Sequence, residues 1–161
     1  MMFLGLITII FLYQCSKDTI LQRYSIIWKA RLAQCKKKPK YKNVLLDIYD
    51  FFENGIKKID NKKVIIDPGI GFGKNLKHNL TLISKISLFH SLGFPILVGT
   101  SRKRFISQLS GVNDSKERIG GTVASVLFLL SQGVQIFRVH NVNEVKQGIL
   151  VFKKILSNFK N

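Results

Sequence analysis

The sequence contains little cysteine, little proline and little acidic charge. Its 161 residues include two cysteines, three prolines and twelve glycines. Two cysteines are too few for a disulfide-stabilised secreted mini-protein, and this proline and glycine content excludes collagen-like and low-complexity chains. Hydrophobic residues make up 46% and aromatic residues 11% of the chain, which excludes a wholly disordered protein. The length fits one domain.

Basic residues greatly outnumber acidic ones. The chain has 26 Lys and Arg against 9 Asp and Glu, a net charge of +17, which raises nucleic acids and anionic membranes as candidate partners. Twenty of the basic residues are lysines and only six are arginines, whereas proteins that read DNA depend on the bidentate contacts of arginine. We attribute the lysine excess to drift toward AT-rich codons. We expect no nucleic-acid partner, although a positive field would still favour an anionic small substrate.

The first fifteen residues are almost continuously apolar. The run is shorter than the roughly 18–20 residues of a membrane-spanning helix, and it lacks the preceding basic residues and the small terminal residues of a signal peptide. We therefore expect no membrane partner and a cytoplasmic location, with the run either buried in the core or not native to the rest of the chain. A short helix is predicted over residues 20–33. Residues 1–38 are treated as an unassigned apolar and basic lead.

From residue 40 onward, short apolar segments alternate with amphipathic ones. Helices are predicted over residues 43–58, 80–89, 104–110, a segment that ends near Gly133, and 142–159; strands are predicted over 64–66, 94–99 and 134–137. Asp114 and Glu117 are expected to cap the helix that ends near Gly133. This alternation predicts an α/β fold of βαβ units on a parallel sheet, in one domain.

Polar side chains follow each predicted strand at its carboxyl end. They are Asp67 after the first strand, Ser101, Arg102 and Lys103 after the second, and Arg138 and His140 at the third. Because the carboxyl ends of parallel strands share one edge of a sheet, these side chains should converge. An aspartate can accept hydrogen bonds from ring N–H groups, while arginine and histidine can hold an anion. The set suits a heterocycle beside a phosphate.

Each of these residues also has a structural interpretation. Asp67 could be a turn cap, because Asp-Pro-Gly is common in turns. Lys103 could be surface charge, and His140 could be a hydrogen-bonded structural residue.

Other motifs are weaker. Gly71 and Gly73 resemble a dinucleotide-binding loop, but the third glycine of that pattern is missing. Ser101 has no His and Asp partners at a recognisable spacing, so we do not assign it as a nucleophile. His78 and His90 are interpreted as structural, and the three histidines and two cysteines support no metal site.

Four segments together resemble the dihydropteroate synthase family, which joins a pterin diphosphate to p-aminobenzoate in folate biosynthesis. They are IIDPGIGFGKN, PILVGTSRKRF, ERIGGTVASVLFLLSQG and FRVHNV, in that order, with PKYKNV before them. The similarity covers residues 39–161. It implies that this region is the C-terminal part of a pterin-binding (β/α)₈ barrel, with pterin diphosphate and p-aminobenzoate as the small-molecule partners.

The resemblance also implies a role for individual residues. Asp67 and Lys103 would bind the pterin, Phe72 and Arg104 would border p-aminobenzoate, Arg138 and His140 would hold the diphosphate, and Lys103, Arg138 and His140 would be catalytic. Mg²⁺ is implied as a cofactor, but no protein ligand for it is found in this sequence.

The sequence departs from the family in its length. A complete (β/α)₈ barrel takes roughly 250 residues, and the motifs of the family's N-terminal half are missing, so a partial, half barrel is predicted. An open half barrel exposes sheet edges and an apolar face. The alternatives are therefore an inactive gene-decay remnant or a half barrel completed by a partner chain, for example as a homodimer. A pterin-dependent methyltransferase is a further alternative, but it gives no reason for SRK and RVH to occur together.

Overall fold

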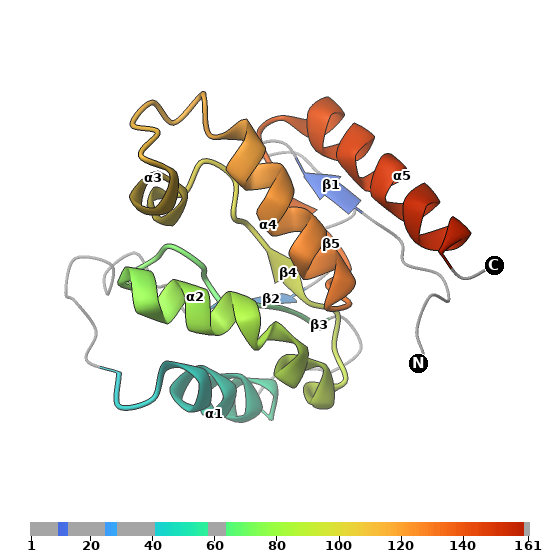
Figure 1. The fold of residues 1–161 in the computed structure, drawn as a ribbon. Helices are drawn as coiled ribbons and strands as arrows, with labels where there is room; N and C mark the ends of the chain where they lie inside the picture. The colour runs from blue at the N-terminus through green and yellow to red at the C-terminus, as the bar shows by residue number, and fades with distance from the viewer. Residues whose placement is uncertain (1–9, 13–24, 29–40, 58–63, 160–161) are drawn as a thin grey trace.

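The computed structural model describes residues 10–12, 25–28, 41–57 and 64–159. Within them, parallel strands alternate with helices (Figure 1). The elements are β1 (Ile10–Leu12), β2 (Ser25–Trp28), α1 (Val44–Ile56), β3 (Val64–Asp67), α2 (Leu76–Ser84), the 3₁₀ helix η3 (Ile86–Leu92), β4 (Leu97–Val98), α3 (Arg104–Ser110), α4 (Ile119–Ser131), β5 (Ile136–Arg138) and α5 (Val142–Asn158). The predicted α/β class is confirmed.

All strand pairs in the described part of the chain are parallel. β2 pairs with β3, and β5 lies between β4 and β1. A parallel bridge between Ile66 and Ile96, with the Ile66 N–H donating to the Pro95 carbonyl at 3.0 Å, joins the two groups. The strand order is therefore β2-β3-β4-β5-β1. In a parallel sheet every carboxyl end lies at the same edge, so the segments after β3, β4 and β5 meet there.

Local sequence signals explain where two of the helices, α1 and α2, begin. Asn43 caps α1 by accepting hydrogen bonds from the N–H groups of Leu45 and Leu46, at 3.1 and 3.3 Å. Asn75 caps α2 by accepting from the His78 N–H at 2.8 Å. A side-chain oxygen in this position satisfies an N–H that the first turn leaves without a helical partner. Asparagine therefore sets the start of both helices.

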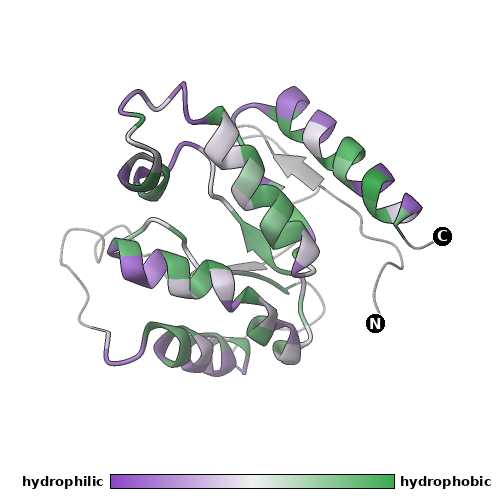
Figure 2. Cartoon of the chain, in the orientation of Figure 1, coloured by the Kyte–Doolittle hydropathy of each residue, from purple (hydrophilic) through white to green (hydrophobic). Residues whose placement is uncertain are grey.

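The helices form a layer over the strands, from α1 through α2 and α4 to α5 (Figure 1). Figure 2 shows α4 as hydrophobic along most of its length, whereas α1 and α5 alternate in hydropathy. The core between the helices and the sheet is aliphatic with three fully buried phenylalanines, Phe52, Phe89 and Phe137. Phe52 and Phe89 meet edge to face, with ring centroids 5.6 Å apart. This core fixes the strands, and hence the loops at their carboxyl ends.

Several predicted elements differ from the structure. The helix predicted over 20–33 is wrong for residues 25–28, which form β2. A short apolar run has no periodicity that distinguishes a helix from a strand. Here the segment is a strand because it pairs with β3. The capping box is also wrong, because α4 begins only at Ile119 and Asp114 Oδ1 instead accepts from the Lys116 N–H at 2.9 Å. The helix predicted from residue 80 begins at Leu76 and passes into a 3₁₀ helix at Ile86.

The apolar lead is described only in part. Residues 10–12 of the first fifteen form β1, while the rest of that run lies outside the described residues. In the part of the chain that the structure describes, no helix combines the length and hydrophobicity needed to cross a membrane.

Candidate functional site

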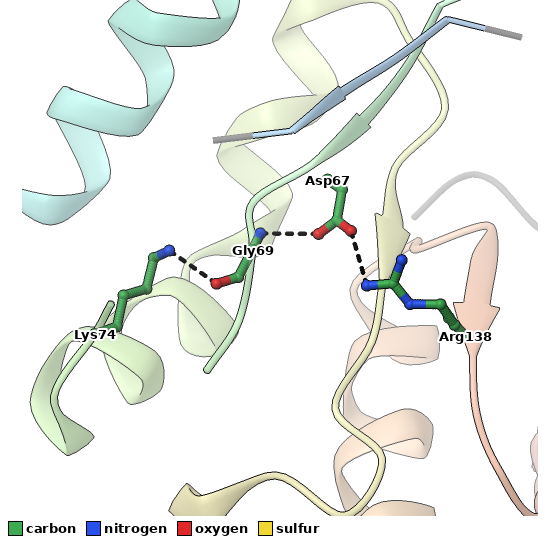
Figure 3. A network of polar contacts seen from close by, with 4 residues as sticks. All are labelled: Asp67, Gly69, Lys74 and Arg138. Atoms are coloured by element: carbon green, nitrogen blue, oxygen red, sulfur yellow. Dashed lines mark hydrogen bonds and ion pairs between the residues drawn. The ribbon is translucent and has the colours of Figure 1, made fainter. Parts of the chain in front are cut away.

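Asp67, the last residue of β3, is the buried acid of the candidate site. Its residue exposure is 1%. One carboxylate oxygen, Oδ1, accepts from the Gly69 N–H at 2.8 Å, and the other, Oδ2, lies 3.3 Å from Arg138 Nη2 (Figure 3). Burial raises the pKa of the Asp67 carboxyl, and the nearby Arg138, the Gly69 N–H and two lysines oppose that rise. Asp67 is thus both a turn cap and half of a buried ion pair.

Arg138 reaches Asp67 across the intervening strand. It ends β5, and its guanidinium lies against Gly99, directly after β4. A Cβ at Gly99 would lie 3.3 Å from both Nε and Nη2 of Arg138. The absence of a side chain at Gly99 therefore leaves room for the guanidinium between β4 and the site.

The loop after β3 is held by polar side chains. Gly69, Gly71 and Gly73 all have positive φ angles, a conformation that glycine adopts without strain. Lys74 Nζ donates to the Gly69 carbonyl at 2.8 Å (Figure 3) and to the Phe72 carbonyl at 3.2 Å. From below the loop, the buried Asn79 accepts the Gly71 N–H at 2.7 Å. The glycine-rich segment is therefore a fixed loop rather than an extended linker.

Lys103 crosses this loop from the segment after β4. Its aliphatic stem packs on Gly71, where an added Cβ would lie 2.8 Å from Lys103 Cδ. Its ammonium group lies 3.6 Å from the centroid of the Phe72 ring, which is cation–π geometry. Lys103 also lowers the pKa of Asp67 through its charge. Two residues to which the family resemblance gave different substrates, Lys103 and Phe72, are in direct contact.

Ser101 and His140 form a second pair at the carboxyl edge of the sheet, called the rim below. Ser101 Oγ lies 2.9 Å from His140 Nδ1 and accepts the backbone N–H of His140 at 3.2 Å. Partial burial lowers the pKa of the His140 imidazole, and the positive charges of Arg102, Lys103 and Arg138 lower it further. Sequence spacing did not identify His140 as a partner of Ser101. The two residues are 39 positions apart in sequence and meet only because β4 and β5 are neighbours.

Arg102 links the carboxyl edge of the sheet to the starts of two helices, α4 and α5. It is the one residue other than glycine with a positive φ in the described part of the chain, at 59°. Its N–H donates to Thr122 Oγ1 at 3.2 Å, its carbonyl accepts from Arg118 at 2.9 Å, and its guanidinium donates to Asn141 Oδ1 at 2.9 Å. These contacts hold a backbone conformation that costs about 1 kcal/mol or more outside glycine.

The charges at this edge suit an anionic ligand that carries hydrogen-bond donors. Arg102, Lys103 and Arg138 bring three positive charges close to His140, and the carboxylate of Asp67 lies within the same group. Fixed cations can stabilise negative charge that develops during a reaction. The buried carboxylate can accept from N–H groups of a ligand.

The structure does not bring every predicted residue together. Asp67, Lys103, Arg138 and His140 share one edge, with Phe72 beneath Lys103. Arg104 begins α3 and is exposed, and the hydrogen bonds and ion pairs of the described residues do not connect it to the others.

Sequence reasoning missed several supporting residues. Lys74, Asn79 and Asn141 all position parts of the site. Lys74 and Asn141 lie within the segments that carry the family resemblance, and Asn79 lies four residues after one of them, so position was their only signal. Gly99 was predicted only as part of a strand. That its missing side chain leaves room for the Arg138 guanidinium could not be predicted from the residue type.

The described residues do not supply a Mg²⁺ site. They contain no cluster of three or more His, Cys, Asp or Glu side chains suited to a metal ion. The carboxylate of Asp67 is engaged by Arg138 and the Gly69 N–H, and the surrounding side chains are cationic. Asp67 therefore does not offer the free carboxylate through which proteins usually hold Mg²⁺ beside a substrate phosphate.

Comparison with known proteins places these residues in one family. The pterin-binding enzyme family matches residues 24–140. Dihydropteroate synthase of Escherichia coli K12 is 39% identical over 128 residues, covering 76% of this chain and 45% of that protein. Dihydropteroate synthase of Bacillus subtilis 168 is 42% identical over 87 residues, covering 54% of this chain and 30% of that protein. The chain thus spans less than half the length of these curated relatives.

Solved structures give the same result. Dihydropteroate synthase of Thermus thermophilus, in complex with 4-aminobenzoate, superposes with a TM-score of 0.76 at 34% identity, covering 81% of this chain and 56% of that one. The Xanthomonas albilineans enzyme, in complex with 7,8-dihydropteroate, superposes with a TM-score of 0.74 at 29% identity, covering 81% and 50%. Sequence, fold and the polar edge of the sheet agree, and the chain belongs to the pterin-binding enzyme family.

Proposed function

We propose that this chain is the C-terminal part of a dihydropteroate synthase and carries the pterin and diphosphate subsites of that enzyme. The observation that carries the proposal is the convergence of Asp67, Lys103, Arg138 and His140 at one edge of the sheet. The reaction joins 6-hydroxymethyl-7,8-dihydropterin diphosphate and p-aminobenzoate to give dihydropteroate and diphosphate.

In this proposal Asp67 recognises the pterin ring. A carboxylate between a backbone N–H and a guanidinium keeps lone pairs for ring N–H donors. Lys103 lies close enough to act on the pKa of Asp67 and would donate to an acceptor atom of the same ring. Burial at 1% exposure makes each hydrogen bond to Asp67 stronger than it would be in water.

Arg138 and His140 would hold the diphosphate as it leaves. In the proposed step, the bond between the pterin methylene carbon and the diphosphate oxygen breaks, and its electron pair remains on the diphosphate. The guanidinium of Arg138 carries a permanent charge, and the imidazole of His140 is exposed at the rim. Donors fixed in place before the step stabilise the charge that develops.

The amine of p-aminobenzoate would then attack the methylene carbon. A C–N bond forms, and the amine nitrogen releases one proton to solvent or to the diphosphate. Phe72 lies under the ammonium of Lys103 and offers an aromatic face beside the pterin subsite. Arg104, at the exposed start of α3, would attract the carboxylate of p-aminobenzoate.

We further propose that residues 39–161 form part of a (β/α)₈ barrel, and that the lead, residues 1–38, contributes β1 and β2 to its sheet. The parallel order β2-β3-β4-β5-β1, with helices between successive strands from β3 onward, supports a partial barrel. A Mg²⁺ cofactor and a cytoplasmic location stay predictions, and no step above requires the metal.

A half barrel that needs a partner chain is the second candidate. Its support is a group of exposed apolar side chains on α5: Leu150, Val151 and Ile155 are 58, 57 and 61% exposed. If a homodimer forms through α5, Ile155→Lys should convert it to a monomer in sedimentation experiments. An unchanged mass would exclude that face.

Two separate assays test the proposed function. Purified chain is assayed for dihydropteroate formation and, in parallel, for binding of a pterin analogue by calorimetry. Asp67→Asn should abolish analogue binding, whereas Lys57→Met, a change on the exposed end of α1, should leave it unchanged. Binding without turnover supports the partner-dependent half barrel. Neither signal from a sample that is folded by circular dichroism would refute the proposed function.

A further inference from the structure

The proposed reaction does not account for the two contacts that Ser101 makes with His140. Ser101 directly precedes the strained Arg102, and its side chain is buried, with 5% of the residue exposed. His140 follows β5 by two residues and is exposed. The hydroxyl oxygen of Ser101 contacts both the backbone N–H and the ring Nδ1 of His140. One buried hydroxyl therefore fixes the position and the ring of one exposed imidazole.

The direction of the ring contact follows from the number of protons available. Ser101 Oγ accepts the backbone N–H of His140 at 3.2 Å. Among the described residues, its only other hydrogen-bond partner is Nδ1, at 2.9 Å. If Nδ1 carried a proton, the oxygen would accept twice and the hydroxyl hydrogen would be buried without an acceptor, which is costly. If the hydroxyl donates to Nδ1, all three groups are satisfied and the ring proton lies on Nε2.

The charges around His140 also favour the neutral imidazole. The charged groups that act on His140 are Arg102 and Lys103, from the segment after β4, and Arg138 at the end of β5. All three are cationic. On the first turn of α5, the one carboxylate, Glu144, accepts from Asn141 Nδ2 at 3.2 Å. A second proton on the imidazole would add a positive charge to this group.

We propose that Ser101 is a positioning residue that holds His140 as the Nε2-protonated tautomer, so that an exposed N–H is available to an anionic phosphate group. This proposal rests on the proposed function for the identity of the anion, a diphosphate. Ser101 need not touch the substrate; it acts through His140. The donor is present before the ligand binds and does not depend on protonation of the ring.

Nuclear magnetic resonance of the full chain with labelled histidines tests the tautomer directly. His140→Gln identifies the signals of His140 among the three histidines. In the native chain, Nδ1 should resonate as an unprotonated nitrogen and Nε2 as a protonated one. In Ser101→Ala the two nitrogens should shift toward a mixture of tautomers. The pKa of His140 should rise as well, because a hydrogen bond to the neutral form is lost.

Matched variants separate positioning from a general effect on the fold. Ser125→Ala removes another partly buried hydroxyl, which donates to the side chain of Thr100 next to Ser101, and it should leave the His140 signals unchanged. Ser101→Thr keeps a hydroxyl and should restore the native tautomer. Calorimetry with inorganic pyrophosphate should show about tenfold weaker binding for Ser101→Ala, the equivalent of one hydrogen bond, and no change for Ser125→Ala.

The outcomes distinguish this proposal from the proposed function. A native His140 with its proton on Nδ1, or the same tautomer and pKa in native and Ser101→Ala chains, would overturn the role of Ser101. A folded chain with the expected tautomer but no affinity for pyrophosphate would instead contradict the diphosphate subsite. The tautomer is measured without ligand, so it does not depend on turnover.

Discussion

Removal of the Arg138 guanidinium should destabilise the folded chain because it leaves a buried carboxylate without its ion-pair partner. Asp67 is 2% exposed at its side chain and lies 3.3 Å from Arg138, whose side chain is 29% exposed. Breaking a buried pair on one side costs about 3–5 kcal/mol. Asp67 keeps the Gly69 N–H and the attraction of two lysines, so we expect a loss near 2 kcal/mol for Arg138→Met. Methionine retains an unbranched apolar stem without the guanidinium.

The loss should depend on pH in a defined direction. The pKa of Asp67 is raised in the folded chain, so its contribution to stability is fully present below the pKa of the unfolded chain and is lost as pH rises through the folded value. Arg138→Met raises that pKa further. The deficit of the variant should therefore be largest near about pH 7.5 and should shrink toward about pH 5, as the carboxyl takes up its proton.

Urea unfolding of a double-mutant cycle gives the measurement. The cycle uses Asp67→Asn, Arg138→Met and the double variant, and the expected coupling is about 1.5–2 kcal/mol near pH 7.5. Lys57→Met removes the exposed ion pair with Glu53, where N and O lie 3.7 Å apart, and should change stability by less than about 0.5 kcal/mol. A coupling energy no larger than the stability change of this control variant, or one that does not vary with pH, would refute the reasoning.

Three further predictions concern the loop and the rim. Gly71→Ala and Gly111→Ala both place alanine at positive φ, 82° and 76°, and should each cost about 1 kcal/mol in urea unfolding; only the first displaces Lys103 and should weaken binding of a pterin analogue. The native chain should lose stability as pH falls from about 7 to 5, because folding lowers the pKa of His140 and so favours its neutral form. His140→Gln should lose less stability over the same range; equal losses in both chains would contradict this. Phe72→Leu should weaken p-aminobenzoate binding but not pyrophosphate binding, measured by calorimetry; equal weakening of both would argue for a structural role.

The sequence predicted the elements whose local signals and tertiary contacts agree. The helix over 43–58 was predicted because its apolar residues recur at three- and four-residue spacing, and the structure places α1 at Val44–Ile56, with Asn43 as its cap. Parallel strands were also predictable, because short apolar runs alternate with helical patterns; Asp67 and Arg138 stand at the ends of two of these strands. The convergence of those residues then follows from topology alone.

The elements that were missed depend on contacts far apart in sequence. Residues 25–28 form a strand because β3 is available to pair with them, and no local period signals this. The Ser101 and His140 contact requires β4 and β5 to be neighbours in register. The ion pair of Asp67 with Arg138 depends on Gly99, whose small size matters only once the strands are in place.

The central claim is that side chains from three strand ends form one ligand site. Calorimetric titration with 6-hydroxymethyl-7,8-dihydropterin diphosphate tests it most directly, with native chain, Asp67→Asn and His140→Gln compared at equal concentration. We predict saturable binding by the native chain that each variant weakens, Asp67→Asn through the pterin and His140→Gln through the diphosphate. Binding that neither variant affects, or none by a folded native chain, would contradict the claim.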